Sequence, residues 1–327
     1  MTTLALSKAI NTGLRQILED DPKSIVMGQD VGGLGGVFRV TDGLQKDFGT
    51  DRVIDTPLAE ASIVGTAIGL ALRGYRPICE IQFDGFVYPA FSQIVAQLAK
   101  LRARTGGKVA VPVVIRIPVG GGIGAVEHHS ESNEAYFAHT AGLRVVCCSD
   151  AQDAHWMLRQ AVESDDPVIF YEPKRRYWTK AEVADDPDDA RVLPFDRARV
   201  VRAGTSLTLL TYGGMVQTCL DAAEAAREDG RDLEVIDLRS LSPLDLATIT
   251  TSVAKTGRCV VAHEAPTFAG LGAEIGSAVS ESCFYHLEAP VLRVGGFNTP
   301  YPPSKFEDQY LPDLDRVLDA VDRSFRF

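Results

Sequence analysis

Short apolar runs alternate with helical segments along the first half of the chain. The runs are rich in β-branched residues and show little polar alternation, and we expect strands at residues 24–28, 77–82, 111–118, 143–148 and 167–173. Helical periodicity lies between them, and we expect helices at residues 60–73, 86–104 and 152–164. Strands that are apolar on both faces and separated by helices are typical of a parallel sheet covered on both sides. The pattern therefore predicts an α/β fold.

The same alternation begins again after a polar interruption. From Lys174 to Arg202 the chain is charged, contains two prolines and shows no sustained period, which is typical of a connection between domains. Beyond it, strand and helix patterns alternate again and include a helix at about 270–282. We therefore predict two doubly wound α/β domains and a linker, at residues 1–185, 204–327 and 186–203 respectively.

The composition excludes several classes of protein. Of the 327 residues, 45% are hydrophobic and 24% are charged, and the formal net charge is −11. An acidic balance of this size disfavours nonspecific binding to nucleic acids and attraction to anionic membranes. The six cysteines contain no CxxC pair and lie mostly in apolar runs, so we interpret them as reduced core residues.

The N-terminus carries no pattern of a targeting signal. We expect an amphipathic helix there, with an apolar stripe formed by Leu4, Ile10, Leu14 and Ile17. No apolar run approaches the length of about 20 residues that a membrane span needs. We expect a cytoplasmic protein if the source is bacterial, and a protein of the mitochondrial matrix if it is eukaryotic.

Two glycine clusters suggest a nucleotide site but do not fit one. They consist of Gly32, Gly33, Gly35 and Gly36, and of Gly120, Gly121, Gly122 and Gly124. A dinucleotide fingerprint needs a third glycine at the start of a helix, and Phe38 stands at that position in the first cluster. The second cluster leads into VEHHSES, which does not open a helix, and no GxxxxGK[ST] motif occurs. We interpret both clusters as loops that turn sharply or approach another chain or a ligand closely.

Glu60 lies at the start of an unusually apolar helix. Thr56 can cap this helix, and Pro57 suits its first turn. Because few of its positions are polar, the helix is predicted to be buried, and Gly65 and Gly69 permit close packing against another element. A carboxylate at a helix N-terminus needs no function, because the helix dipole stabilises it there. A carboxylate on a buried helix, however, needs a specific partner or favours its protonated form.

Aromatic residues and histidines follow two of the expected strands. Phe83, Phe86 and Tyr88 come at the end of one strand, where open parallel sheets bind ligands, although core packing is the common fate of a single aromatic residue. His128 and His129 follow the second glycine cluster. Adjacent histidines on a strand would face opposite sides and so would not share a metal. Either one can act as an acid or base near neutral pH, and either can equally be a solvated loop residue.

Taken together, the chain resembles the beta subunit of the decarboxylating component of 2-oxo acid dehydrogenases, a branch of the transketolase-like thiamine enzymes. The resemblance extends from about residue 5 to residue 321. Each matching fragment is only moderately specific, but their order and spacing together are highly specific. The matching stretches are residues 28–49, 52–72, 80–94, 129–146, 165–175 and 287–303.

The resemblance assigns roles to individual residues. In the family, the glutamate of TPLAE bonds N1′ of the aminopyrimidine of thiamine diphosphate and promotes loss of the thiazolium proton, which places that role on Glu60. The aromatic residue that stacks on the pyrimidine matches Phe86, and Leu58 and Gln82 match positions beside the cofactor. His129 matches the histidine that assists proton transfer when the acyl group passes to lipoamide. The family's structural monovalent cation, often potassium, would lie near Val113, Ala161, Ser164 and Asp166, although the side chains there differ from the family.

The resemblance also implies partners. The family's diphosphate–magnesium motif, Gly-Asp-Gly followed by Asn, is absent from this sequence and belongs to the alpha subunit. The chain is therefore expected to supply the pyrimidine half of a shared site, and the alpha subunit the half with diphosphate and magnesium. A two-alpha, two-beta heterotetramer that docks onto a lipoyl acyltransferase core follows from the same resemblance.

Four positions depart from the family pattern, and several functions stay open. Asp84-Gly85 replaces alanine-aspartate, His128 stands where tyrosine or glutamine is common, and Glu131 replaces glutamine. The motifs favour branched-chain 2-oxo acids as substrates, and the alternative is a pyruvate or acetoin dehydrogenase beta subunit. An NAD-linked oxidoreductase lacks its fingerprint here. A noncatalytic assembly subunit would not need Glu60, Phe86 and His129.

Overall fold

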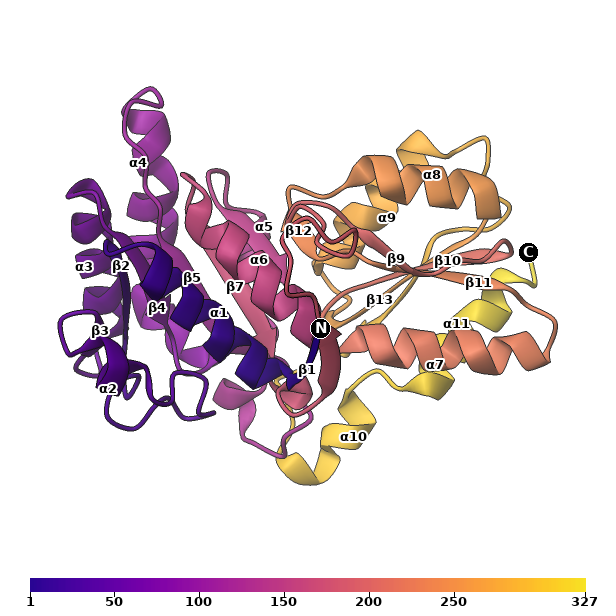
Figure 1. Ribbon diagram of the computed structural model, residues 1–327. Coiled ribbons are helices and arrows are strands. Elements are labelled where there is room, and N and C mark those ends of the chain that lie inside the picture. Colours follow the sequence, from indigo (N-terminus) through magenta and orange to yellow (C-terminus); the bar gives the residue numbers. More distant parts are fainter.

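A seven-stranded sheet forms the centre of the N-terminal half in the computed structural model, which describes residues 1–327 (Figure 1). All its strands are parallel except β12, which pairs antiparallel with β6. Its strands, in spatial order, are β12 (Ser240–Ser242), β6 (Arg144–Cys147), β7 (Val168–Pro173), β5 (Val114–Val119), β4 (Arg76–Glu80), β2 (Ser24–Gly28) and β3 (Val53–Asp55).

Helices cover both faces of this sheet because successive strand residues point to opposite sides. On β4, Ile78 belongs to the core under α1 (Leu6–Asp20) and α6 (Ala151–Glu163). Cys79 belongs to the core on the opposite face. That face is covered by α3 (Glu60–Leu72), the 3₁₀ helix η1 (Asp84–Ala90), the π-helix η2 (Gln93–Leu98) and α4 (Ala99–Arg104).

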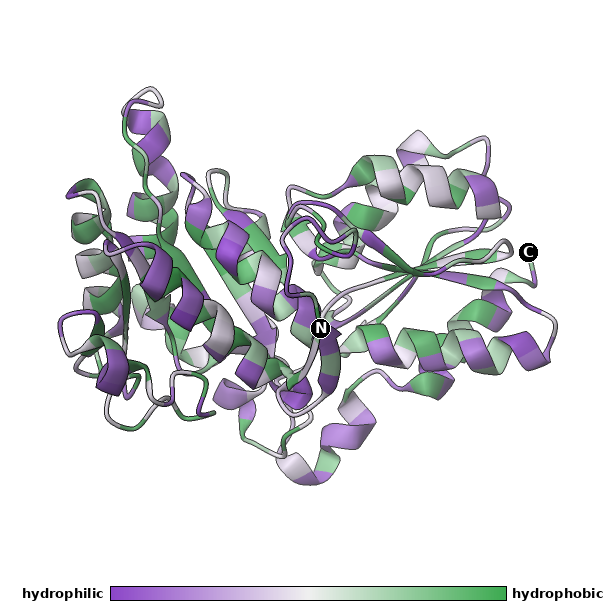
Figure 2. Cartoon of the chain, viewed as in Figure 1, coloured by the Kyte–Doolittle hydropathy of each residue, from purple (hydrophilic) through white to green (hydrophobic).

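The C-terminal half contains a second sheet, again sandwiched between helices. Its order is β14 (Leu292–Gly296), β13 (Cys259–Pro266), β10 (Leu207–Thr211), β11 (Leu233–Asp237) and β9 (Arg199–Arg202), and only β9 is antiparallel. Figure 1 shows α7 (Met215–Glu228) and α11 (Leu314–Ser324) on one face, with α8 (Leu246–Thr256) and α9 (Leu271–Ser282) on the other. In Figure 2 hydrophobic residues concentrate in the strands, and polar residues line the outer turns of the helices.

The two halves share one hydrophobic core. A cluster of 38 buried residues runs from α3 and the seven-stranded sheet to α8 and α9 of the C-terminal half. Strand β12, which follows the C-terminal strand β11 in the chain, completes the N-terminal sheet. The remaining elements are the β1–β8 pair (Thr2–Ala5 and Lys180–Val183), α2 (Leu44–Phe48), α5 (Glu134–Ala138), α10 (Glu307–Tyr310), η3 (Glu127–His129), η4 (Lys174–Arg176) and η5 (Ser304–Phe306).

The α/β class and the five expected strands of the first half are confirmed, and two expected helices need correction. Residues 2–5 form strand β1, so Leu4 precedes helix α1 instead of belonging to its apolar stripe. The single helix expected at 86–104 is three shorter elements, and Pro89, which lacks a backbone N–H, lies in the first of them. Strand β9 lies inside the expected linker at 186–203, and the domain boundaries stay a prediction.

The structure also bears on the expectations for the cysteines and for membrane-spanning segments. All six cysteines are free and buried. None of the helices combines the length and apolar character that crossing a membrane would require.

Candidate active site

Four parallel strands bring the predicted site residues to one edge of the sheet. Strands β5, β4, β2 and β3 are neighbours in that order, so their carboxyl ends share one edge. Glu60 follows β3, Gln82 and Phe86 follow β4, and His129 follows β5. This edge is where open parallel sheets bind ligands. The sheet topology thus gathers residues that are up to 69 positions apart in the sequence.

Glu60 is the first residue of α3, and the start of this helix sets the position of its side chain. Its side chain is only 9% exposed, and no hydrogen bond or ion pair within the chain engages its carboxylate. The positive end of the helix dipole lies beside it. The expected cap is wrong: Ala59 occupies the cap position, and the Thr56 hydroxyl is buried without a partner. A carboxylate on a largely buried residue that lacks an internal partner is suited to a hydrogen bond with a bound group.

Helix α3 is not buried on all sides, contrary to the sequence expectation. Leu72 is 51% exposed, and side chains added at Gly65 or Gly69 would meet nothing within 4 Å. Ile63 and Val64, in contrast, belong to the shared core. The helix therefore has one packed face and one open face, on which Ser62 and Thr66 are exposed together with Gly69 and Leu72.

Three rings pack around that of His129, the predicted acid–base residue. The Phe83 and His129 centroids are 4.1 Å apart, and the Phe86 and His129 centroids are 5.1 Å apart. The ring of His128 lies 4.4 Å from that of His129. Both histidines lie in the 3₁₀ turn η3, so the argument that they face opposite sides of a strand does not apply. Phe86 packs on the edge of the shared core and is half-buried, which leaves part of its ring available for stacking.

Burial sets the protonation state of His129. Desolvation lowers the pKa of its imidazole below the ordinary value, and the charges of His128 and Lys174 act in the same direction. Its Nδ1 atom is buried without a hydrogen-bond partner. His129 is therefore neutral at neutral pH, and one of its ring nitrogens is left unsatisfied by the chain itself.

The structure explains the Asp84-Gly85 departure. The Asp84 carboxylate and the Lys174 ammonium group are both fully buried and lie 2.5 Å apart. Burial raises the pKa of Asp84 to about 6, while Lys174 acts to lower it. A Cβ atom at position 85 would lie 2.4 Å from the backbone oxygen of His128, so only glycine lets the histidine turn approach η1 this closely. Lys174 was missed by the sequence analysis because its partner is 90 residues away.

The other predicted cofactor residues occupy different environments. The Gln82 amide donates to the Asp30 carboxylate at 2.9 Å, which fixes its orientation at the sheet edge. Leu58 is 66% exposed in the loop before α3. Glu131 accepts a hydrogen bond from the Tyr88 hydroxyl at 3.2 Å, so the extra acid in place of glutamine is tied to η1.

The expected cation region is occupied by arginine side chains. Arg102 and Arg144 each bind one oxygen of the Asp166 carboxylate, at 2.6 Å and 3.2 Å. Arg76 donates to the Ser164 carbonyl at 3.3 Å and to the neighbouring carbonyl of Val162 at 2.7 Å. The Val113 and Ala161 carbonyls accept backbone N–H groups. Guanidinium groups therefore already use oxygens that a monovalent cation would need, and these residues do not fit a bound cation.

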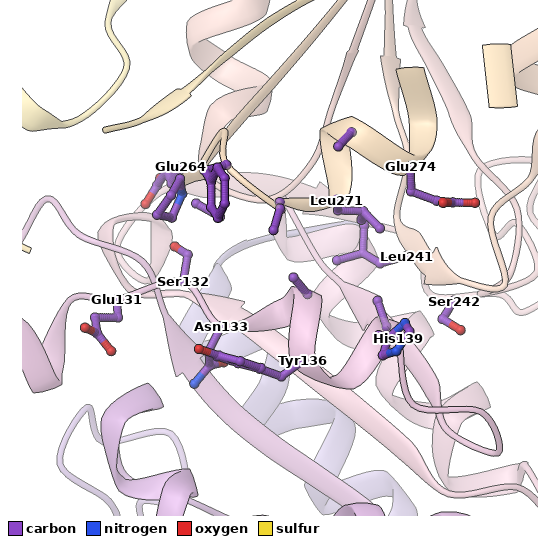
Figure 3. Close-up of a pocket in the computed structure, with 18 of the residues that line it drawn as sticks. Glu131, Ser132, Asn133, Tyr136, His139, Leu241, Ser242, Glu264, Leu271 and Glu274 are labelled. Atoms are coloured by element: carbon purple, nitrogen blue, oxygen red, sulfur yellow. The ribbon is translucent and has the colours of Figure 1, made fainter. Parts of the chain in front are cut away.

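Both glycine clusters approach carboxylates of this same chain. The Gly32 and Gly33 N–H groups donate to Asp55 at 2.6 Å and 3.0 Å. The second cluster meets residues of the C-terminal half beside a cavity of about 1330 Å³. Figure 3 shows this cavity between the halves: Glu131, Ser132 and Tyr136 line one wall, and Glu264, Leu271 and Glu274 the opposite wall. Glu60, Phe86 and His129 lie outside this cavity.

Comparisons with known proteins agree with this geometry. Residues 2–179 match the family described as "Transketolase, pyrimidine binding domain", and residues 196–317 match "Transketolase, C-terminal domain". A solved structure described as "Split gene transketolase, inactive beta4 tetramer" has a TM-score of 0.80 at 24% identity and covers 99% of this chain and 98% of its own. That likeness shows a shared fold.

Curated relatives match over nearly the whole chain. The pyruvate dehydrogenase E1 component subunit beta of Leifsonia xyli is 60% identical, covering 99% of this chain and 96% of the relative. The 3-methyl-2-oxobutanoate dehydrogenase subunit beta of Mycobacterium tuberculosis is 52% identical, covering 99% and 92%. The 2-oxoisovalerate dehydrogenase subunit beta of Pseudomonas aeruginosa is 48% identical, covering 99% and 95%. The chain therefore belongs to the transketolase-like family of 2-oxo acid dehydrogenase E1 beta subunits.

Proposed function

We propose that this chain is the beta subunit of a thiamine-diphosphate-dependent dehydrogenase that decarboxylates a branched-chain 2-oxo acid and transfers the acyl group to lipoamide. The observation that carries the proposal is Glu60, a largely buried residue whose carboxylate no group of the chain engages, at the sheet edge that also holds Phe86 and His129. Two of the relatives are named for branched-chain substrates. The relative at 60% identity is named for pyruvate, which keeps pyruvate as the second candidate.

The residues at the edge fit one half of a thiamine site. When bound, the cofactor supplies the electron sink that decarboxylation requires. Glu60 would hold a proton at a ring nitrogen of the cofactor, because no group of the chain engages its carboxylate. Phe86 offers a flat apolar surface for an aromatic ring. Gln82 and Leu58 border the same position.

His129 is suited to proton transfer in the acyl-transfer step. It is neutral at neutral pH and one of its ring nitrogens has no partner, so it could take up a proton that the substrate loses and donate it to the sulfur atom released when the lipoamide disulfide opens. Phe83 and Phe86 hold the ring by edge-to-face contacts. The aromatic packing thus orients the imidazole without using its nitrogen atoms.

The other half of the site belongs to a partner in this proposal. The sequence has no motif for diphosphate or magnesium, and the pyrimidine edge lies outside the large cavity of the single chain. An alpha subunit would supply magnesium and the diphosphate contacts, and two of each subunit would form the heterotetramer that docks onto a lipoyl acyltransferase core. The open face of α3, where Gly65 and Gly69 leave room beside the helix backbone, offers a surface for such an assembly.

The Glu60→Gln variant tests the central residue. We expect it to lose at least 100-fold in decarboxylation with an artificial electron acceptor, because loss of a positioned acid–base group typically costs a factor of about 10²–10⁴. The matched control is Glu163→Gln, which changes an exposed glutamate at the end of α6. Both variants are expected to co-purify with the alpha subunit. Unchanged turnover in the Glu60 variant would remove Glu60 from this role.

The acyl substrate is decided by turnover of the reconstituted pair. Purified alpha and beta subunits are assayed with 3-methyl-2-oxobutanoate, 4-methyl-2-oxopentanoate, pyruvate and acetoin, and kcat/KM is compared. We expect the branched substrates to have the highest kcat/KM. A higher value for pyruvate or acetoin would select the alternative enzyme, and reduction of NAD by the beta chain alone would overturn the whole proposal.

A further inference from the structure

The loop that leads to His129 is bound by two carboxylates from the other half of the molecule. The N–H of Gly121 donates to Glu264 at 3.0 Å. The N–H groups of Gly122 and Gly124 donate to the two oxygens of Glu307 at 2.9 Å and 2.8 Å. Glu264 lies in β13 and Glu307 begins α10. Successive loop N–H groups that converge on a carboxylate form the same kind of nest that binds anions elsewhere.

Only glycine allows this approach. Gly120, Gly122 and Gly124 all have positive φ angles, between +68° and +86°. A Cβ atom at Gly121 would lie 1.9 Å from the Tyr301 hydroxyl oxygen, and one at Gly120 would lie 2.4 Å from a carboxylate oxygen of Glu264. The glycine cluster is therefore explained by contact with residues of the same chain, without a nucleotide.

The two carboxylates are themselves fixed. The Tyr301 hydroxyl donates to the Glu307 oxygen that also accepts from Gly122, at 2.6 Å. The Arg175 guanidinium binds Glu264 at 2.9 Å. Glu307 is buried and Glu264 is nearly so, which strengthens hydrogen bonds to their charges.

The same loop is closed around His129. The N–H of Gly120 donates to the backbone oxygen of Glu131 at 3.0 Å, so the two ends of the loop 120–131 are joined. Within it, the N–H of His129 donates to the oxygen of Val126 at 3.0 Å. The loop is thus attached at its base and to two carboxylates of the C-terminal half, and His129 lies two residues before its second end.

We propose that Glu264 and Glu307 are positioning residues: they lock loop 120–131 to the C-terminal half and thereby hold His129 at the cofactor edge. The inference rests on the role given to His129 in the proposed function. It assigns the C-terminal half a part in catalysis that acts through the loop, without contact with substrate or cofactor.

Amide hydrogen exchange of the full beta chain tests the lock without any turnover. In Glu307→Gln the amide group can accept only one of the two loop N–H bonds and presents an N–H group to the other. We expect the amides of Gly122 and Gly124 to exchange at least tenfold faster than in the wild type. Asp308→Asn, an exposed neighbour on the same short helix, is the control and is expected to match the wild type. If the Glu307 variant folds poorly, Tyr301→Phe gives a milder test, because it removes only one hydroxyl group. We expect the same loop amides to exchange about threefold faster in this variant.

Turnover of the alpha–beta pair tests the link to His129. We expect Glu307→Gln to lower lipoamide acylation at least tenfold while decarboxylation with an artificial acceptor falls less than threefold. Unchanged exchange in both Glu307→Gln and Tyr301→Phe would overturn the lock. Faster exchange with unchanged acylation, or with an equal loss of both reactions, would overturn the link to His129. A wild-type pair that decarboxylates none of the 2-oxo acids would instead overturn the proposed function, and the exchange result would still decide the lock.

Discussion

His129 illustrates how a single residue is prepared for proton transfer by its surroundings. Desolvation and two neighbouring positive groups lower the pKa of its imidazole, and two phenylalanine rings hold it without using its nitrogen atoms. His128, its neighbour, is half-exposed and lies near Glu127. The two adjacent histidines therefore lie in different environments, and only His129 has a buried ring nitrogen without a hydrogen-bond partner.

This difference predicts unequal effects of two matched variants. His129→Ala should lower acyl transfer to lipoamide about 100-fold and decarboxylation much less, because a positioned acid–base group contributes a factor of about 10²–10⁴ to the step it serves. His128→Ala should change either rate less than threefold. Single-turnover assays of the alpha–beta pair separate the two steps. Equal loss of both steps in His129→Ala, or the larger effect in His128→Ala, would contradict the assignment.

The buried ion pair of Asp84 and Lys174 gives a second prediction at the residue scale. Lys174→Met should lower the free energy of unfolding by about 3–5 kcal/mol, because it leaves a buried carboxylate without its partner. In Asp84→Ala/Lys174→Met no unpaired charge is left, so the double variant should lose less than the sum of the two single variants. Urea unfolding of the beta chain gives the four free energies. Additive losses would show that the two groups do not stabilise each other.

At the scale of elements, the two faces of α3 lie in different environments. Ile63 and Val64 pack into the shared core, while the opposite face is open and carries Gly65, Gly69 and Leu72 together with the exposed Ser62 and Thr66. The glycines keep this face flat, so a second chain can approach the helix backbone closely.

Substitution of these glycines should have opposite effects on the chain and on the assembly. Gly65→Ala and Gly69→Ala should each stabilise the isolated chain by up to about 1 kcal/mol, because alanine favours a helix and nothing lies within 4 Å of the new methyl group. Leucine at both positions should prevent assembly with the alpha subunit. Urea unfolding measures the first effect and size-exclusion chromatography of the mixed subunits the second. Normal assembly of the double leucine variant would show that this face stays free.

The sequence could predict those elements that are indicated by their own residues, without a distant partner. The strands at 24–28, 143–148 and 167–173 are buried on both faces, and their apolar runs alone indicate this. The strand character of residues 2–5 depends on pairing with β8, about 180 residues later, which no local pattern contains. The open face of α3 was not recognised in the sequence, because Ser62 and Thr66 are the only polar residues between Glu60 and Leu72. Glu60 and His129 were found through motifs, whereas Lys174, Glu264 and Glu307 act through partners far away in the sequence.

At the scale of the whole molecule, the two sheets are joined by more than a linker. They share a core of 38 residues, and β12 extends the N-terminal sheet. Arg239 is fully buried at this junction: its side chain binds Asp153 of α6 at 3.0 Å and donates to the backbone oxygens of Pro194 and Arg197. Asp153 also binds Arg199. Separation of the halves would thus expose apolar surface and break a buried charge network.

The halves should therefore unfold together, and Arg239→Met should weaken both at once. The variant leaves Asp153 with one arginine instead of two, and we expect a loss of about 3–5 kcal/mol in the free energy of unfolding. Arg227→Met, whose arginine forms only an exposed pair with Glu224, should leave the free energy of unfolding nearly unchanged. Both tryptophans, Trp156 and Trp178, lie in the N-terminal half, so their fluorescence reports that half while circular dichroism reports the whole chain. The two signals should change at the same urea concentration in each variant, because neither half can keep its side of the shared core without the other. Fluorescence and circular dichroism midpoints that differ in the wild type would show that the halves unfold independently, and the junction at Arg239 would then be a contact between two separately stable domains.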